Sequence, residues 1–201
     1  LEIGSVRPTQ GRTLAVMQQW SLDDNEHVRR LASEGSRPRL PWSFRLAQVQ
    51  ADPRLCASIL ENLKADSSLY VRKSVANHLN DITKDHPDWV LDVIESWSLD
   101  NPHTAWIARH ALRSLIKQGN TRALTIMGAG ARAEVKIHQF KVEPPVISLG
   151  ERINLSFSLE STTSAPQKLV VDYAIDYVKS AGHSAAKVFK LKAFTLGAGE
   201  R

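Results

Sequence analysis

The sequence predicts an α-solenoid followed by an antiparallel β-sandwich, with a helical repeat domain in residues 1–130 and a β domain in residues 131–201. From Thr13 to about Met127, apolar residues recur at the spacing of amphipathic helices. Around Gly128 this pattern stops, and apolar residues then alternate with polar ones as they do in strands. The helical part also repeats itself, which is typical of a solenoid.

The repeat is visible in three segments that each close one helix and open the next, beginning at Trp20, Leu63 and Trp97. Aligning them makes Val28, Val71 and Ile107 equivalent. The intervals, 71 − 28 = 43 and 107 − 71 = 36 residues, bracket the roughly 40 residues of a HEAT or armadillo repeat. We therefore expect HEAT-like repeats, with Trp20 and Trp97 packed between helices.

In each repeat, the second helix sorts its side chains into a buried stripe and an outward face. The stripe of the middle repeat is predicted to be Val71, Val75, Leu79 and Ile82. The predicted outward residues are Arg30 and Glu34 with His27 nearby, then Lys73, Asn77, Asn80 and Lys84 with Asp81 on their flank, then Arg109, Arg113 and Lys117. Outward charge on one helix is usually a solvated surface. Cations at corresponding positions in three repeats favour polyanion binding on the concave face.

Residues 27–42 combine charge, stiffness and an aromatic side chain. A helix with Val28, Leu31 and Ala32 on one side is expected to stop at Gly35, in a left-handed turn. Two prolines, Pro38 and Pro41, then stiffen a loop. The side chains expected to project from this loop, with Glu34 at its hinge, are Arg37, Arg39 and Trp42. The segment is a candidate active site, and the alternative is a connection whose Trp fills the core.

The β domain is predicted from alternation in three stretches. They are Ile153 to Leu159, Val171 to Tyr177, and Phe189 to Leu191, with turn signals at Pro144-Pro145 and in 161–166. Four or five strands are expected, whereas a complete sandwich of this kind has about seven. We therefore expect an incomplete sandwich and a chain that is a piece of a longer protein.

Composition limits the function classes further. The net charge of +5 and a pI near 9.5 favour a polyanionic partner. The single cysteine, Cys56, excludes an internal disulfide and a CxxC metal site, which fits a reducing compartment and predicts a cytoplasmic protein. Neither a membrane-length apolar run nor a metal-binding histidine spacing nor a Gly-rich phosphate loop occurs, so no membrane, metal or cofactor is expected. Residue types alone leave Ser-His-Asp catalysis open.

Two blocks of the helical part, HVRRLASEGSRPRLPW at 27–42 and VANHLNDI at 75–82, resemble the bacterial DNA alkylation-repair glycosylases. The resemblance is to the AlkC branch of the AlkC/AlkD family and extends over residues 14–130, and the β domain is similar to the extra C-terminal domain of some members. The resemblance implies that the β domain is an immunoglobulin-like sandwich. It also implies that Glu34 and Asp81, in the helical part, are acidic residues facing the lesion-bearing nucleotide. Trp42 would lie beside that nucleotide, Asn77 would contact it, and a further carboxylate would precede Leu1.

The chemistry implied is excision of cationic N-alkylated bases, with N3-methyladenine as the expected substrate, in base excision repair. A positively charged base leaves readily, so an ionised carboxylate near the sugar suffices to stabilise the oxocarbenium-like transition state. The resemblance further implies that the damaged nucleotide is engaged without a base-flipping pocket. The residues expected to bind DNA are His27, Arg30, Arg37, Arg39, Lys73, Asn80, Lys84, Arg109, Arg113 and Lys117.

The expected partner is double-stranded DNA that contains alkylated bases, bound by a monomer. A different class of function fits the same fold, because helical repeat arrays are more often scaffolds than enzymes. The alternative is therefore a non-catalytic scaffold that binds nucleic acid or protein.

Overall fold

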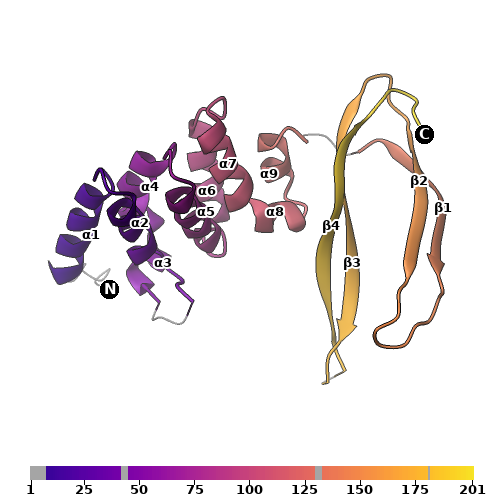
Figure 1. The fold of residues 1–201 in the computed structure, drawn as a ribbon, viewed down its shortest axis with the longest axis horizontal. Coiled ribbons are helices and arrows are strands. Elements are labelled where there is room, and N and C mark those ends of the chain that lie inside the picture. Colours follow the sequence, from indigo (N-terminus) through magenta and orange to yellow (C-terminus); the bar gives the residue numbers. More distant parts are fainter. Residues whose placement is uncertain (1–7, 42–44, 130–132, 181) are drawn as a thin grey trace, which may run out of the picture. The chain divides into compact units, whose positions relative to one another are not determined.

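The computed structural model describes residues 8–41, 45–129, 133–180 and 182–201 (Figure 1). The chain divides into two compact units, Leu1–Ala123 and Leu124–Arg201. The first unit is helical and the second consists of strands after the end of one helix. In the described part of the chain, no helix combines the length and the apolar character needed to cross a membrane.

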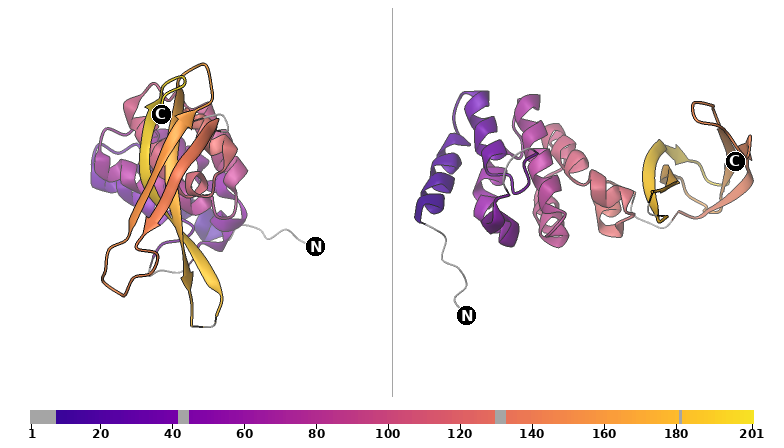
Figure 2. Two further views of the ribbon diagram at one scale, coloured as in Figure 1. Left: turned by 90° about the vertical axis from the view of Figure 1, so that its right-hand side faces the viewer. Right: turned by 90° about the horizontal axis from the view of Figure 1, so that it is seen from below.

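The helical unit is a stack of short helices, in agreement with the predicted solenoid (Figure 2). In chain order they are α1 (Pro8–Trp20), α2 (Glu26–Gly35), α3 (Ala47–Ala51), the 3-10 helix η1 (Pro53–Cys56), α4 (Ala57–Leu63), α5 (Leu69–Ile82), α6 (Pro87–Ser96), α7 (Pro102–Ala111), α8 (Arg113–Lys117) and α9 (Thr121–Ile126). The second helices of the three aligned repeats are α2, α5 and α7, and α5 packs against both of the others.

Two of the three aligned segments form helix starts with an N-cap side chain, and the third begins α5 at Ser68 without a side-chain cap. The Asn25 side chain accepts a hydrogen bond from the backbone N–H of His27, and the Asn101 side chain accepts from that of His103, both at 2.9 Å. Pro102 then occupies the first turn of α7, where a missing N–H costs nothing. An Asp-Asn sequence therefore precedes the first residue of both α2 and α7.

The core of the helical unit confirms the predicted stripe of α5. Val71, Val75, Leu79 and Ile82 are all fully buried. Two other expectations are wrong in part. Trp97 is buried and its indole N–H donates to Glu61 Oε2 at 2.8 Å, but Trp20 is exposed. Leu31 of α2 is 51% exposed, so it does not share the buried side of the helix with Ala32 as predicted.

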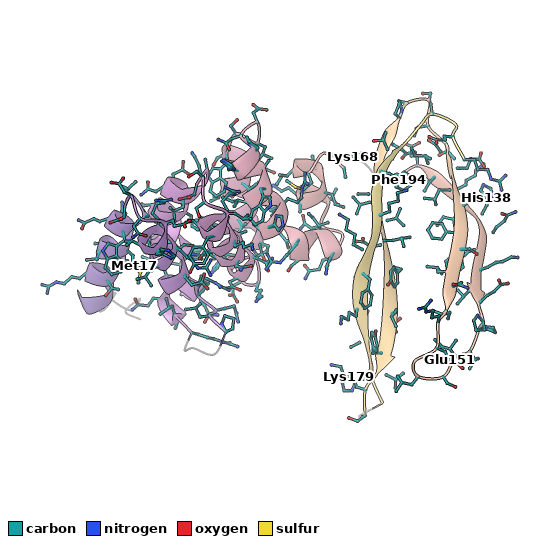
Figure 3. The ribbon with its side chains drawn as sticks, viewed as in Figure 1. Met17, His138, Glu151, Lys168, Lys179 and Phe194 are labelled. Atoms are coloured by element: carbon teal, nitrogen blue, oxygen red, sulfur yellow. The ribbon has the colours of Figure 1, made fainter. Side chains whose placement is uncertain are left out.

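Gly35 ends α2 for a different reason from the one predicted. It does not have the positive φ of a left-handed turn, which the structure shows at other glycines such as Gly119. A Cβ atom at Gly35 would instead lie 2.8 Å from Cε of Met17, a residue of α1 that is labelled in Figure 3. The glycine therefore permits a close approach between α1 and α2, while the Ser36 hydroxyl bonds the Ala32 carbonyl at 2.7 Å.

The described strands of the second unit form two antiparallel pairs, as the alternation predicted. They are β1 (Val135–Glu143) with β2 (Asn154–Ser161), and β3 (Gln167–Val178) with β4 (Ser184–Leu196). The two connecting turns are marked in Figure 3 by Glu151 and Lys179. Strand β1 was not among the predicted stretches, because a register shift around Gln139, whose φ is 53°, interrupts its alternation.

Candidate active site

The two predicted catalytic carboxylates come together through one arginine. Arg37, which follows α2, donates from Nη1 to Glu34 Oε1 at 2.6 Å. It also donates from Nε and Nη2 to Asp81 Oδ2, at 2.9 and 2.7 Å. Only 9% of the Arg37 side chain and 8% of the Asp81 side chain are exposed, against 26% for Glu34. A single guanidinium thus ties the end of α2 to α5.

The remaining carboxylate oxygens also have partners. The Ser74 hydroxyl donates to Glu34 Oε2 at 2.6 Å, and Arg30 Nη2 lies 3.5 Å from the same oxygen. Lys84 Nζ lies 3.3 Å from Asp81 Oδ1. Three cations therefore surround two carboxylates in the free protein, which offsets the negative potential of the carboxylates.

The position of Arg37 corrects the prediction that it projects from the loop toward DNA. Arg37 donates two charge-assisted hydrogen bonds to one oxygen of a buried carboxylate, and such bonds are stronger than neutral ones, so the side chain folds inward against α5. Two other side chains, those of Arg39 and Trp42, were predicted to project from the same loop. Arg39 is partly exposed and forms an ion pair with Asp85 at 2.7 Å, and Trp42 lies outside the described residues. The ion pair raises the pKa of Arg39 and lowers that of Asp85.

The loop and α5 line an open pocket of about 400 Å³ beside this cluster. Its lining consists of Arg37, Arg39, Leu40, Pro41, Arg45, Asp81 and Lys84. Arg45 was not among the predicted site residues, although it continues the series of arginines at 37 and 39. Four cations against one carboxylate make the pocket suited to an anionic group such as a phosphate.

The prediction that Asn80 faces outward and binds DNA is also wrong, because the residue is buried. Its Nδ2 donates to the Ala111 carbonyl at 2.8 Å and to the Ser114 hydroxyl at 3.0 Å. Because both α2 and α7 pack against α5, the exposed face of α5 is narrower than that of a helix with one neighbour. Asn77 stays on that face, half-buried, and its Oδ1 accepts from Arg113 Nη2 at 3.0 Å.

The other predicted DNA-binding residues remain at the surface. His27, Lys73, Lys84, Arg109 and Lys117 are exposed, and Arg30 is partly exposed. Lys73 and Arg109 make no ion pair with any residue that the structure describes, which leaves their charges available to a ligand. Arg30 and Lys73 occupy equivalent places on two helices that pack together, α2 and α5.

Sequence reasoning missed one feature of this face. Tyr70 on α5 is 45% exposed, and the Arg30 guanidinium lies over its ring. The signal was present in the alignment, because the residue before each of the equivalent positions Val28, Val71 and Ile107 is aromatic.

His78, which follows Ser74 by one helical turn on α5, is fully buried. Burial, and then the positive charge of Arg37, lower the pKa of His78 to about 3. The imidazole is therefore neutral in the folded protein at neutral pH.

The titration of His78 makes stability depend on pH. Below the ordinary pKa of 6.5 the unfolded chain takes up a proton that the folded protein excludes, so the free energy of unfolding falls as pH falls from 6.5 toward about 3. We expect a contribution of at most about 1.4 kcal/mol per pH unit. Urea denaturation between about pH 6.5 and 5 should show a shallower dependence for His78→Gln. Equal pH dependence in both proteins would contradict the assignment.

Comparison with known families places this geometry in context. The model of a family described as DNA alkylation repair enzyme matches residues 6–115, more than half of the chain. The chain belongs to this family. A second model, described as the C-terminal Ig-like domain of the uncharacterised protein YhaZ, matches residues 136–201. The predicted resemblance and the immunoglobulin-like character of the second unit are thus confirmed.

Three known proteins show different degrees of similarity to the chain. The solved structure of Pseudomonas fluorescens alkylpurine DNA glycosylase AlkC, bound to DNA containing an abasic site analog, is 84% identical, with a TM-score of 0.93 over 96% of this chain and 54% of that one. The uncharacterized protein YhaZ of Bacillus subtilis is 45% identical over 191 residues, which are 93% of this chain and 53% of YhaZ. AlkD2 from Streptococcus mutans is 33% identical, with a TM-score of 0.45 over 52% of this chain and 48% of that one. The chain spans about half the length of these relatives.

Proposed function

We propose that the chain is part of a DNA glycosylase that excises cationic N-alkylated bases, with N3-methyladenine as its main substrate. The observation that carries this proposal is the pair of carboxylates, Glu34 and Asp81, held by Arg37 at a face rich in cations. The 84% identity to an alkylpurine DNA glycosylase supports the reaction class. The partner is double-stranded DNA that contains the alkylated base.

The geometry favours different roles for the two carboxylates. Glu34 is the more exposed, so its carboxylate is the one that can approach a sugar and stabilise the positive charge that develops there. Asp81 is buried and accepts two hydrogen bonds from Arg37, so it fixes the position of the guanidinium that also binds Glu34. A cationic leaving group needs little protonation, which agrees with a site built from ionised groups.

Release of the free base decides between this proposal and the scaffold alternative. The full-length protein is incubated with duplex DNA carrying N3-methyladenine or N7-methylguanine, and the released bases are separated by chromatography. We expect release of N3-methyladenine, much slower release of N7-methylguanine, and release of both slowed about a hundredfold in Glu34→Gln. Retention of DNA without release of either base would identify a binding scaffold.

The cations of α5 and α7 should bind the DNA backbone. Each phosphate contact that is lost lowers the slope of log K against log[salt] by about 0.9, so Lys73→Ala and Arg109→Ala should each reduce the slope by about that amount. Arg54→Ala is the matched control, because Arg54 is exposed but already paired with Asp52 at 2.7 Å. Binding of undamaged duplex at several salt concentrations measures the slopes. Slopes equal to wild type for both variants would leave these cations as solvated surface.

A further inference from the structure

The outward face of each second helix carries an aromatic residue and a cation three positions apart. The aromatic residues form what we call the aromatic row, His27, Tyr70 and Trp106. The cations are Arg30, Lys73 and Arg109. Because residues three apart are neighbours on one helix face, each repeat presents its aromatic ring beside its cation.

The contacts that matter here join α2 to α5, whereas Trp106 stacks on His110 of its own helix and lies near Arg72 of α5. The Arg30 guanidinium of α2 lies 4.1 Å from the ring centroid of Tyr70 on α5, and Arg30 Nη1 donates to the Tyr70 carbonyl at 2.7 Å. The His27 ring meets the Tyr70 ring edge-on, at 5.5 Å between centroids. Tyr70 therefore supports a cation of the neighbouring helix through both its ring and its backbone.

The contact with the Tyr70 ring constrains the guanidinium, and the N–H groups that do not point at the ring stay able to donate hydrogen bonds. For Arg30, one edge is turned toward the Tyr70 carbonyl and toward Glu34, at 3.5 Å, and the Nε edge makes no hydrogen bond to a described residue. Ordering this side chain in the free protein reduces the entropy lost on binding.

We propose that Tyr70 is a positioning residue for DNA binding, whose ring holds the Arg30 guanidinium ready for a backbone phosphate of duplex DNA. Since Arg30 also lies beside Glu34, that phosphate belongs to the nucleotide at the candidate active site or to its neighbour. The inference rests on the proposed DNA-binding face, but not on base excision itself.

A double-mutant cycle on undamaged duplex DNA tests the coupling in the full-length protein. Tyr70→Leu should weaken binding roughly two- to fivefold, the range for an exposed cation–aromatic contact, and Tyr70→Phe should bind as wild type because it keeps the ring. Arg30→Ala should weaken binding and lower the salt slope by about 0.9. Adding Tyr70→Leu to Arg30→Ala should cause no further loss.

Two results would overturn the proposal. One is an equal effect of Tyr70→Leu with and without Arg30, which would mean that the ring does not act through the arginine. The other is a lower melting temperature with unchanged DNA affinity of the folded variant, which would mean a purely structural role. Base release is measured separately on the same variants. Coupling without release of alkylated bases would reject the proposed excision and keep this inference, and release without coupling would do the reverse.

Discussion

Replacing Arg37 by alanine is expected to lower the free energy of unfolding by about 3–5 kcal/mol, the cost of removing one partner from a buried ion pair. The loss is large because Asp81 would stay buried without the two hydrogen bonds that it accepts from Arg37. Glu34 would lose the one hydrogen bond that it accepts from Arg37, at 2.6 Å. Chemical denaturation of wild type and variant at neutral pH measures the difference.

Arg39→Ala is the matched control for this prediction. Arg39 lies two residues further along the same loop and forms a bidentate pair with Asp85, but both side chains are partly exposed. Such pairs contribute about 0–1 kcal/mol, so the control should remain close to wild type. Similar losses in Arg37→Ala and Arg39→Ala would show that burial of the first pair does not determine its strength.

Replacing Glu34 by glutamine is expected to slow base excision about a hundredfold while the protein stays folded. The change removes a charge and keeps the shape, and one lost electrostatic contact to a transition state typically costs about 3 kcal/mol. The partial exposure of Glu34 lets the amide be solvated, so the loss of stability should be small. Single-turnover release of N3-methyladenine from duplex DNA measures the rate at saturating enzyme.

Asp81→Asn should differ from Glu34→Gln, although the sequence treats the two carboxylates alike. The amide introduced at position 81 would oppose Arg37 with a neutral oxygen inside the fold, so stability should fall together with the excision rate. Comparing rate and melting temperature for both variants separates the roles. Rates equal to wild type in both variants would remove the carboxylates from the mechanism.

The sequence predicted those parts of the molecule that depend on local periodicity. The helical spacing of Val71, Val75 and Leu79 identified the buried stripe of α5, because a helix that packs on a core must repeat its apolar residues every three to four positions. The repeated segments beginning at Trp20 and Trp97 indicated that a helix follows each of them, and the Asn25 and Asn101 caps give the local reason. Family resemblance, rather than periodicity, indicated Glu34 and Asp81.

Errors arose where a side chain's position depends on its neighbours in space. Periodicity predicts that Asn80 points away from the buried stripe of α5. It does not predict that α7 packs on that side and accepts a hydrogen bond from Asn80. In the same way, periodicity does not show that Leu31 is 51% exposed, or that Gly35 is needed because Met17 approaches from α1.

By itself, the sequence determined the succession of helices and strands, the repeat and the family, because each of these depends on residues that are close together in the chain. Only the tertiary structure decided that Arg37 turns inward to join Glu34 and Asp81, and that Tyr70 lies beneath Arg30. Both arrangements form between α2 and α5, which are separated in sequence and meet only when the repeats stack. Charge on a predicted outward face can bind a ligand or pair with the next helix, and the packing of that helix determines which occurs.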